Sequence, residues 1–236
     1  MAERGTNKMN ITEFNNSDEI TNFLANDISA KLTAAIKERG QATLFVSGGR
    51  SPIALFQQLS HVELDWSNVV ISLVDDRWVD DKHESSNELL VNTYLLKNKA
   101  SAATFIGLVG QEDSAFDGAE NAAARIADIK IIDALILGMG EDGHTASIFP
   151  CSEQVDAAMA AGNQQRLIAT QPTTAPFERI SLTLNEILAA KQVYLPLSGS
   201  GKVGVFEQAR VLDDVKQMPI AAVIKQHNAL DVLISQ

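Results

Sequence analysis

Hydrophobic residues recur along the chain with two spacings, which predict helices and strands in succession. From Ser17 to Gly40 the apolar positions fall three or four residues apart, as on one face of an α-helix. Short continuous apolar runs such as 42–46 are typical of buried strands. Strands are expected at 42–46, 69–75, 131–137, 166–170, 180–184, 193–197 and 231–235, and helices at 17–40, 51–59, 86–96, 117–127, 202–210 and from Pro219.

Strands that alternate with helices predict an α/β fold with three layers, in which helices cover both faces of a mostly parallel sheet. At 180–184 apolar and polar residues alternate, which predicts a strand with one less buried face. No linker divides the chain, so we expect a flexible tail at residues 1–10 and one domain over 11–236. Ligands of such sheets bind beyond the carboxyl ends of the strands.

Composition narrows the choice of partners. The 236 residues include 19 Lys and Arg against 30 Asp and Glu, a net charge of −11, which disfavours nucleic acid as a partner. Cys151 is the single cysteine in the sequence, so an intrachain disulfide is excluded and a reducing compartment is expected. No apolar run approaches the roughly 18 residues that span a bilayer, and we expect a cytoplasmic protein without membrane contact.

A glycine pair follows the first expected strand. The sequence Ser-Gly-Gly-Arg-Ser-Pro at 47–52 lies between that strand and a helix start. Glycines let successive N–H groups turn inward, and a helix N-terminus adds partial positive charge, so the segment suits a phosphate. A plain strand-to-helix turn explains the same residues equally well.

Two carboxylates and an arginine, Asp75, Asp76 and Arg77, follow the second strand. They fit a metal site, an acid/base pair or a solvated loop. The four histidines of the chain show no metal-ligand spacing, so no metal is expected.

The richest stretch is 138–145, Gly-Met-Gly-Glu-Asp-Gly-His-Thr. It satisfies the dinucleotide pattern G-x-G-x-x-G, but that motif needs a long helix afterwards, and Pro150 intervenes. Alternatively, the glycines expose Asp142 and His144 at a strand end. A histidine beside a carboxylate is the usual composition of a general base at neutral pH. A loop histidine bonded to the backbone is the simpler alternative.

Two cations stand at the ends of later elements, Arg179 before a strand and Lys202 at the opening of a helix. Either could be an ordinary surface charge. In so acidic a chain, their placement favours a local pocket for an anion.

Together these segments resemble the 6-phosphogluconolactonase family over nearly the whole chain. The matching pieces are 47–52, 75–77, 86–87, 137–150, 179–183 and 199–202, in the family's order. The resemblance implies a Rossmann-like fold similar to glucosamine-6-phosphate deaminase. It also implies hydrolysis of 6-phosphoglucono-δ-lactone to 6-phosphogluconate in the oxidative pentose phosphate pathway. No cofactor is expected, and the protein is expected to be a monomer or weak homo-oligomer.

The resemblance also suggests roles for individual residues. His144 would be the general base, oriented by Asp142 or Asp75, and N–H groups of the 138–143 turn would stabilise the oxyanion. Substrate-binding residues, at the phosphate or at sugar hydroxyls, would be Ser47, Gly48, Gly49, Arg50, Arg77, Asn87, Arg179 and Lys202.

Two other functions fit the same fold. A deaminase resembles the block at 142–150 but carries a catalytic Glu just before the proline, where this chain has Phe149. A sugar-phosphate sensor would carry a fused helix-turn-helix, which the pattern before residue 42 does not predict. The lactonase interpretation is therefore preferred.

Overall fold

The computed structural model describes residues 9–235, so residues 1–8 of the predicted tail lie outside the described residues. Met9 and Asn10 already belong to a strand. That strand lies at the edge of the sheet and four of its six residues are exposed, which is why its pattern did not predict burial.

The main sheet contains β1 (Met9–Phe14), β2 (Ala42–Val46), β3 (Val69–Leu73), β5 (Thr104–Ile106), β6 (Ala134–Ile136), β9 (Val193–Ser198) and β10 (Leu230–Ser235). Within residues 9–235 these seven strands follow the order β1-β10-β9-β6-β2-β3-β5, with parallel neighbours throughout. The predicted parallel α/β sheet is therefore confirmed.

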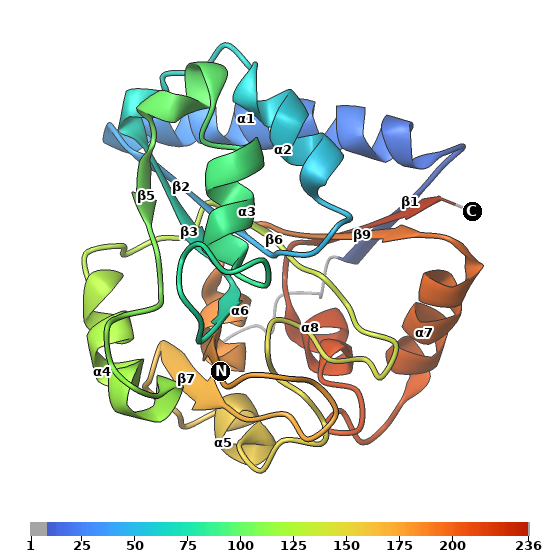
Figure 1. Ribbon diagram of the computed structural model, residues 1–236. Helices are drawn as coiled ribbons and strands as arrows, with labels where there is room; N and C mark the ends of the chain where they lie inside the picture. The colour runs from blue at the N-terminus through green and yellow to red at the C-terminus, as the bar shows by residue number, and fades with distance from the viewer. Residues whose placement is uncertain (1–8, 236) are drawn as a thin grey trace, which may run out of the picture.

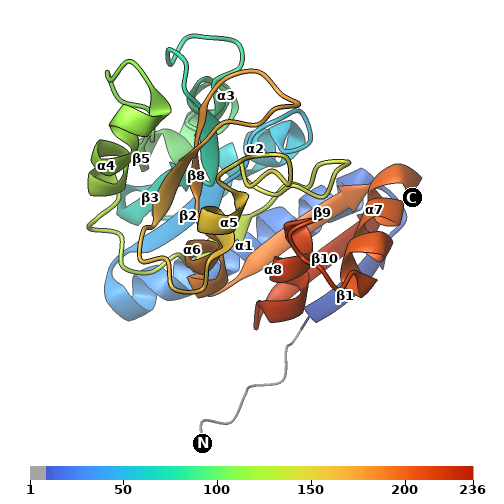
Figure 2. The same cartoon turned by 90° about the horizontal axis from the view of Figure 1, so that it is seen from below.

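Helices cover both faces of this sheet (Figures 1 and 2). On one side lie α1 (Ser17–Arg39) and α2 (Ile53–Ser60), with α3 (Asn87–Tyr94) packed against α2. On the other lie α6 (Leu184–Ala189), α7 (Ser200–Val211) and α8 (Ile220–Gln226). The remaining helices are α4 (Ala115–Arg125), α5 (Val155–Met159) and short 3-10 turns at Trp66–Asn68 and Asn98–Ala102. No helix in the described range is long and apolar enough to cross a membrane.

A second, antiparallel sheet was not predicted. It is formed by β4 (Asp75–Arg77), β8 (Arg179–Leu182) and β7 (Leu167–Thr170), in that order. The expected strand 69–75 therefore ends early, and its last residue opens β4. The less buried face expected at 180–184 is wrong, because Ser181 is fully buried and accepts the N–H of Ser147.

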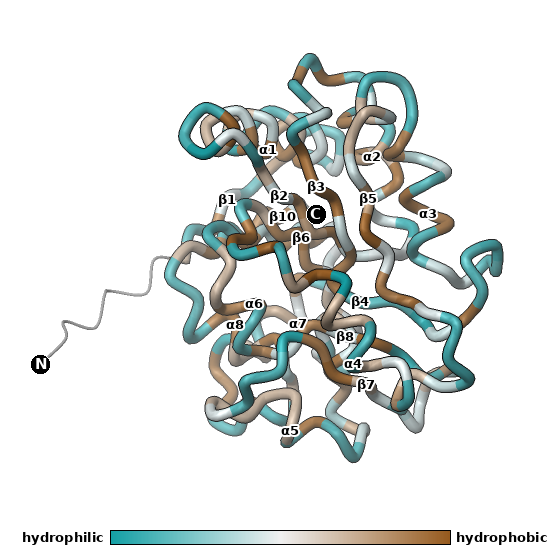
Figure 3. The backbone as a smooth tube through the Cα atoms, turned by 90° about the vertical axis from the view of Figure 1, so that its left-hand side faces the viewer, coloured by the Kyte–Doolittle hydropathy of each residue, from teal (hydrophilic) through white to brown (hydrophobic). Residues whose placement is uncertain are grey.

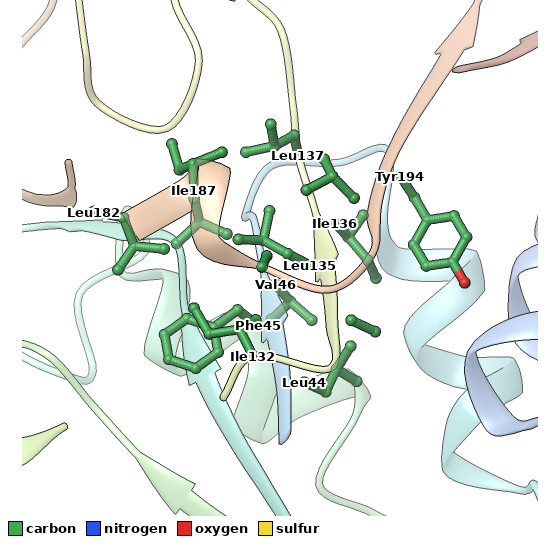
Figure 4. Packing of buried hydrophobic residues seen from close by; sticks show 14 of the residues in the cluster. Leu44, Phe45, Val46, Ile132, Leu135, Ile136, Leu137, Leu182, Ile187 and Tyr194 are labelled. Carbon is green, nitrogen blue, oxygen red and sulfur yellow. The ribbon is translucent and has the colours of Figure 1, made fainter. Parts of the chain in front are cut away.

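The core is built from the central strands. Hydrophobic residues concentrate in these strands, whereas many of the loops around them are hydrophilic (Figure 3). Leu44, Leu135 and Tyr194 are fully buried on three neighbouring strands. Ile187 of α6 approaches from one side of these strands, and Tyr194 lies on the other (Figure 4). Such packing fixes the heights of the strand ends relative to one another.

The order of the strands reverses next to β2. From β2 the chain adds β3 and β5 outward on one side, then returns to place β6 on the other side of β2, followed by β9 and β10. At such a reversal the loops after the two central strands diverge and leave a crevice at their carboxyl ends. Val46, Ile136 and Tyr194 lie level across β2, β6 and β9, so the loops that follow begin at the same edge.

A buried histidine makes stability depend on pH. His227 is 1% exposed; its Nε2 donates to the Ala190 carbonyl oxygen at 2.9 Å, and its Nδ1 accepts from the Ala229 N–H at 3.0 Å. Burial lowers the pKa of His227, with these hydrogen bonds opposing the shift. The unfolded chain therefore takes up the proton first, and the free energy of unfolding falls as pH drops below about 6.5.

We expect His227→Gln to reduce this loss of stability between pH 7 and pH 5, as measured by urea unfolding at several pH values. An unchanged slope in the variant would mean that other groups cause the pH dependence.

Candidate active site

A cavity of about 450 Å³ opens at the carboxyl ends of the central strands. The loops after β2, β6 and β9 form much of its wall, and β4 and β8 contribute further side chains. The polar and charged lining includes Ser47, Asp75, Arg77, Asn87, His144, Arg179 and Lys202, and Gly48 and Gly49 also line it. Nine of the predicted site residues thus meet in one place.

Strand alternation decides which of the residues at 75–77 face the cavity. Successive side chains of a strand point to opposite faces, so Asp75 and Arg77 share one face and Asp76 takes the other. Arg77 lies opposite Arg179 in the register of β4 and β8, which brings two guanidinium groups to the same wall. Like charges in this position repel each other, and an anion between them would offset the repulsion.

Asp76 is not part of the cavity wall. It is fully buried, and its carboxylate accepts the backbone N–H groups of Arg77, Asn87 and Glu88 at 2.7–3.1 Å. Burial raises the pKa of Asp76 to about 7, although the three hydrogen bonds oppose the shift. Asp76 therefore joins the first turn of α3 to β4. This structural role is not a metal site, an acid/base pair or a solvated loop, the three alternatives for Asp75 and Asp76.

Asn87 is held at the start of α3 against the glycine loop. Its Nδ2 donates to the Asp75 carbonyl oxygen at 2.8 Å, and its Oδ1 accepts from Nη1 of Arg77 at 3.4 Å. A Cβ on Gly48 would lie 1.8 Å from Oδ1 of Asn87. A side chain at position 48 would therefore displace the Asn87 amide, which favours glycine there.

Asp75 is fixed by a residue that the sequence did not single out. Oγ of Ser147 donates to Oδ2 of Asp75 at 2.5 Å, and both residues are buried. Asp75 also lies close enough to Arg179 to favour the charged guanidinium.

His144 is paired with Asp142. Its Nδ1 lies 2.6 Å from Oδ1 of Asp142, which also accepts the His144 N–H at 3.1 Å. Both side chains are partly exposed, at 29% and 40%. Of the two carboxylates considered for this position, Asp142 contacts the imidazole and Asp75 is engaged with Ser147. This pairing leaves Nε2 as the ring nitrogen available to a ligand.

The glycine turn between these elements is held by its own hydrogen bonds. The N–H groups of Gly138, Gly140 and Gly143 donate to Ser47 Oγ, the His144 carbonyl and the Gly140 carbonyl, at 2.9–3.1 Å. These three N–H groups already donate within the protein and cannot also donate to an oxyanion. The expectation that this turn supplies an oxyanion hole is therefore wrong for these three groups. The Ser47 hydroxyl is likewise used, since it donates to the Ile136 carbonyl at 2.7 Å.

The predicted cations take different positions. Arg179 is 6% exposed, and burial lowers its pKa. Among the described residues, its Nε and that of Arg77 are buried without a hydrogen-bond partner. Lys202 is half-buried in the first turn of α7, and its Nζ reaches the Met139 carbonyl at 2.5 Å. Arg50 is exposed and is not one of the described residues that line the cavity.

Sequence reasoning also missed Phe149 as a neighbour of the histidine. Its ring stacks on His144 with centroids 3.9 Å apart, and the Arg179 guanidinium lies 5.1 Å from its centroid. An apolar residue five positions after a histidine carries no local signal of such a contact. Among residues 9–235, no group of three or more His, Cys, Asp or Glu is placed to hold a metal ion.

The fold and the cavity define an α/β protein with a crevice at a topological switch point, with arginine and lysine side chains and His144 in its wall and Asp142 paired with that histidine. Residues 15–232 match the family described as Glucosamine-6-phosphate isomerases/6-phosphogluconolactonase. The chain belongs to this family.

Individual relatives agree with this assignment. The chain is 44% identical to a 6-phosphogluconolactonase of Neisseria meningitidis over 84% of this chain and 86% of the relative. It is 39% identical to one of Pseudomonas aeruginosa over 86% and 85%. The crystal structure of a 6-phosphogluconolactonase from Shewanella baltica superposes with a TM-score of 0.94 at 42% identity, covering 98% of this chain and all of that one. A monomeric glucosamine-6-phosphate deaminase, 16% identical with a TM-score of 0.81, shares the fold.

The position of His144 depends on the absence of a side chain at Gly140. A Cβ there would lie 2.1 Å from Nδ1 of His144 and 2.6 Å from Oδ1 of Asp142. We expect Gly140→Ala to displace the imidazole and to lower the activity of the site about 100-fold, the typical cost of a misplacement near 1 Å. The measurement is the rate of the reaction proposed below.

Gly162→Ala is the matched control, because a Cβ at Gly162 would meet open space. It should leave the rate unchanged, and both variants should keep the melting temperature of the parent. Full activity of Gly140→Ala would show that the imidazole position is not needed.

Proposed function

We propose that this protein hydrolyses 6-phosphoglucono-δ-lactone to 6-phosphogluconate, the lactonase step of the oxidative pentose phosphate pathway. The observation that carries the proposal is one cavity whose wall contains His144, Arg77, Arg179 and Lys202, with Asp142 bonded to the His144 imidazole. Relatives named 6-phosphogluconolactonase at 44% and 39% identity support the same substrate.

The phosphate is bound where the glycine loop faces α7. Lys202 stands in the first turn of α7, where the helix dipole already contributes positive charge. A cation is unfavourable there on its own, so the arrangement is suited to an anion. Gly48 and Gly49 offer backbone N–H groups on the facing loop, and Arg179 adds a buried cation. Arg50 stays a candidate at the outer edge.

The sugar end of the substrate is held by other groups. Arg77 and Asn87 lie side by side on the cavity wall and present donors to ring hydroxyls. A phosphate anchored at one end and hydroxyls held along the ring leave the lactone carbonyl in a fixed position beside His144. Such fixed geometry converts the attack of water into an effectively unimolecular step.

In the reaction, Nε2 of His144 takes a proton from water, and the water oxygen forms a bond to the lactone carbonyl carbon. The tetrahedral intermediate collapses when the bond between that carbon and the ring oxygen breaks. The ring oxygen receives the proton from the imidazolium, and the acid product ionises to a carboxylate. Asp142 fixes the tautomer and stabilises the imidazolium between these steps. Cations of the wall offset the charge of the intermediate.

His144→Ala should lower kcat by about 10² to 10⁴-fold, because it removes proton transfer while leaving the phosphate contacts in place. The measurement is hydrolysis of freshly prepared 6-phosphoglucono-δ-lactone, corrected for spontaneous opening. KM should change little.

Full activity of this variant would contradict the assignment of the base. Release of ammonia from glucosamine 6-phosphate by the parent protein, without lactone hydrolysis, would instead assign a deaminase. Neither activity would indicate a sugar-phosphate sensor.

Lys202→Ala and Arg179→Ala should raise KM at least tenfold and change kcat less, because each removes a charge-assisted contact to the phosphate. Steady-state kinetics on the same lactone measure both constants. Lys191→Ala is a control that should change neither constant, because Lys191 lies beside Asp133 at the amino ends of the strands, away from the cavity. Unchanged KM in both site variants would place the phosphate elsewhere.

A further inference from the structure

We propose that Phe149 is a positioning residue that sets the tilt of the His144 imidazole and joins it to Arg179. The inference deepens the proposed function and rests on it, since His144 is the base there. Phe149 is 3% exposed and does not line the cavity among the described residues. It therefore acts through its neighbours and has no direct contact with the ligand.

One hydrogen bond does not fix an imidazole ring. The contact between Nδ1 of His144 and Asp142 sets the direction of one ring atom, but the ring can still rotate about that direction. The Phe149 ring removes this freedom, because the two rings stack with centroids 3.9 Å apart and planes only 22° apart. Asp142 and Phe149 together determine where Nε2 points.

Phe149 is itself held firmly. The Ser152 N–H donates to its carbonyl at 3.1 Å, and the Ile148 N–H donates to the Thr145 carbonyl at 3.0 Å. The stack is therefore built into the turn that follows the base, and it does not require a ligand to form.

The same ring contacts the anion-binding wall. The Arg179 guanidinium carbon lies 5.1 Å from the Phe149 centroid, within the range of a cation–π contact. Arg179 keeps a buried Nε without a partner in the described part of the chain. A phosphate bound to Arg179 would therefore contact a guanidinium that lies over the Phe149 ring, and that ring stacks on the His144 imidazole. Phe149 thus contacts His144 through its stacked ring and Arg179 through a cation–π contact.

The test compares Phe149→Leu with the parent by NMR of the histidine ring protons and by kinetics. In the parent, the His144 ring protons should be shifted upfield by the facing phenyl ring, with His144→Ala identifying their signals among the four histidines. Phe149→Leu should abolish the shift and lower kcat about three- to tenfold, the range expected from one aromatic pair. KM should rise by less than kcat falls.

Phe206→Leu is the matched control for a general packing defect. Phe206 is also fully buried with an arginine over its ring, Arg210 at 5.9 Å, and lies outside the cavity lining. Both variants should lose thermal stability, but Phe206→Leu should keep kcat and the His144 signals.

A double-mutant cycle with Asp142→Asn separates positioning from packing. Because Asp142 and Phe149 restrain the same ring, the loss of kcat in the double variant should be smaller than the product of the single losses. Independent losses, or His144 signals unshifted in the parent, would overturn the proposal. The NMR signature does not depend on the substrate, so it stands or fails separately from the lactonase activity.

Discussion

The adjacency of β2 and β6 at the reversal of strand order is the constraint on which the site depends. Because these strands are parallel and level at Val46 and Ile136, the loops that follow them begin at the same edge of the sheet. One loop supplies the glycine pair and the other supplies Asp142 and His144. The apolar core beneath holds the two loops at a fixed separation, so the glycine pair and His144 rest on one rigid support.

The small antiparallel sheet supplies the two arginines of the cavity wall, which the main sheet does not carry. Pairing of β4 with β8 brings Arg77 opposite Arg179, and both reach the cavity. The cost of opposing two like charges, and of burying Arg179, is understandable if an anion is the ligand. The overall charge of −11 therefore coexists with a cationic cavity wall, because the fold concentrates a few cations at one edge.

Local patterns predicted the elements whose signals are local. The continuous apolar run 42–46 became β2, and the helical spacing from Ser17 onward became α1, which ends at Gly40 with φ of +78°. The pair Asp142 and His144 was also visible, because both residues lie in one short turn. The strand that pairs with β4, β8, lies about 100 residues away, so neither β4 nor the facing arginines could be predicted from local patterns. The contacts of Phe149 with His144 and of Ser147 with Asp75 were not predicted either, because they depend on how the loop folds and not on residue type.

In the proposed function, one cavity holds a phosphate between the glycine loop and α7 and presents a lactone carbonyl to His144. The most direct measurement is a crystal structure of the protein with 6-phosphogluconate bound. We expect the phosphate within hydrogen-bond distance of Gly49 and Lys202, and the product carboxylate beside Nε2 of His144. A product bound in the reverse direction, with its phosphate at His144, would show that the phosphate site and the base are assigned wrongly.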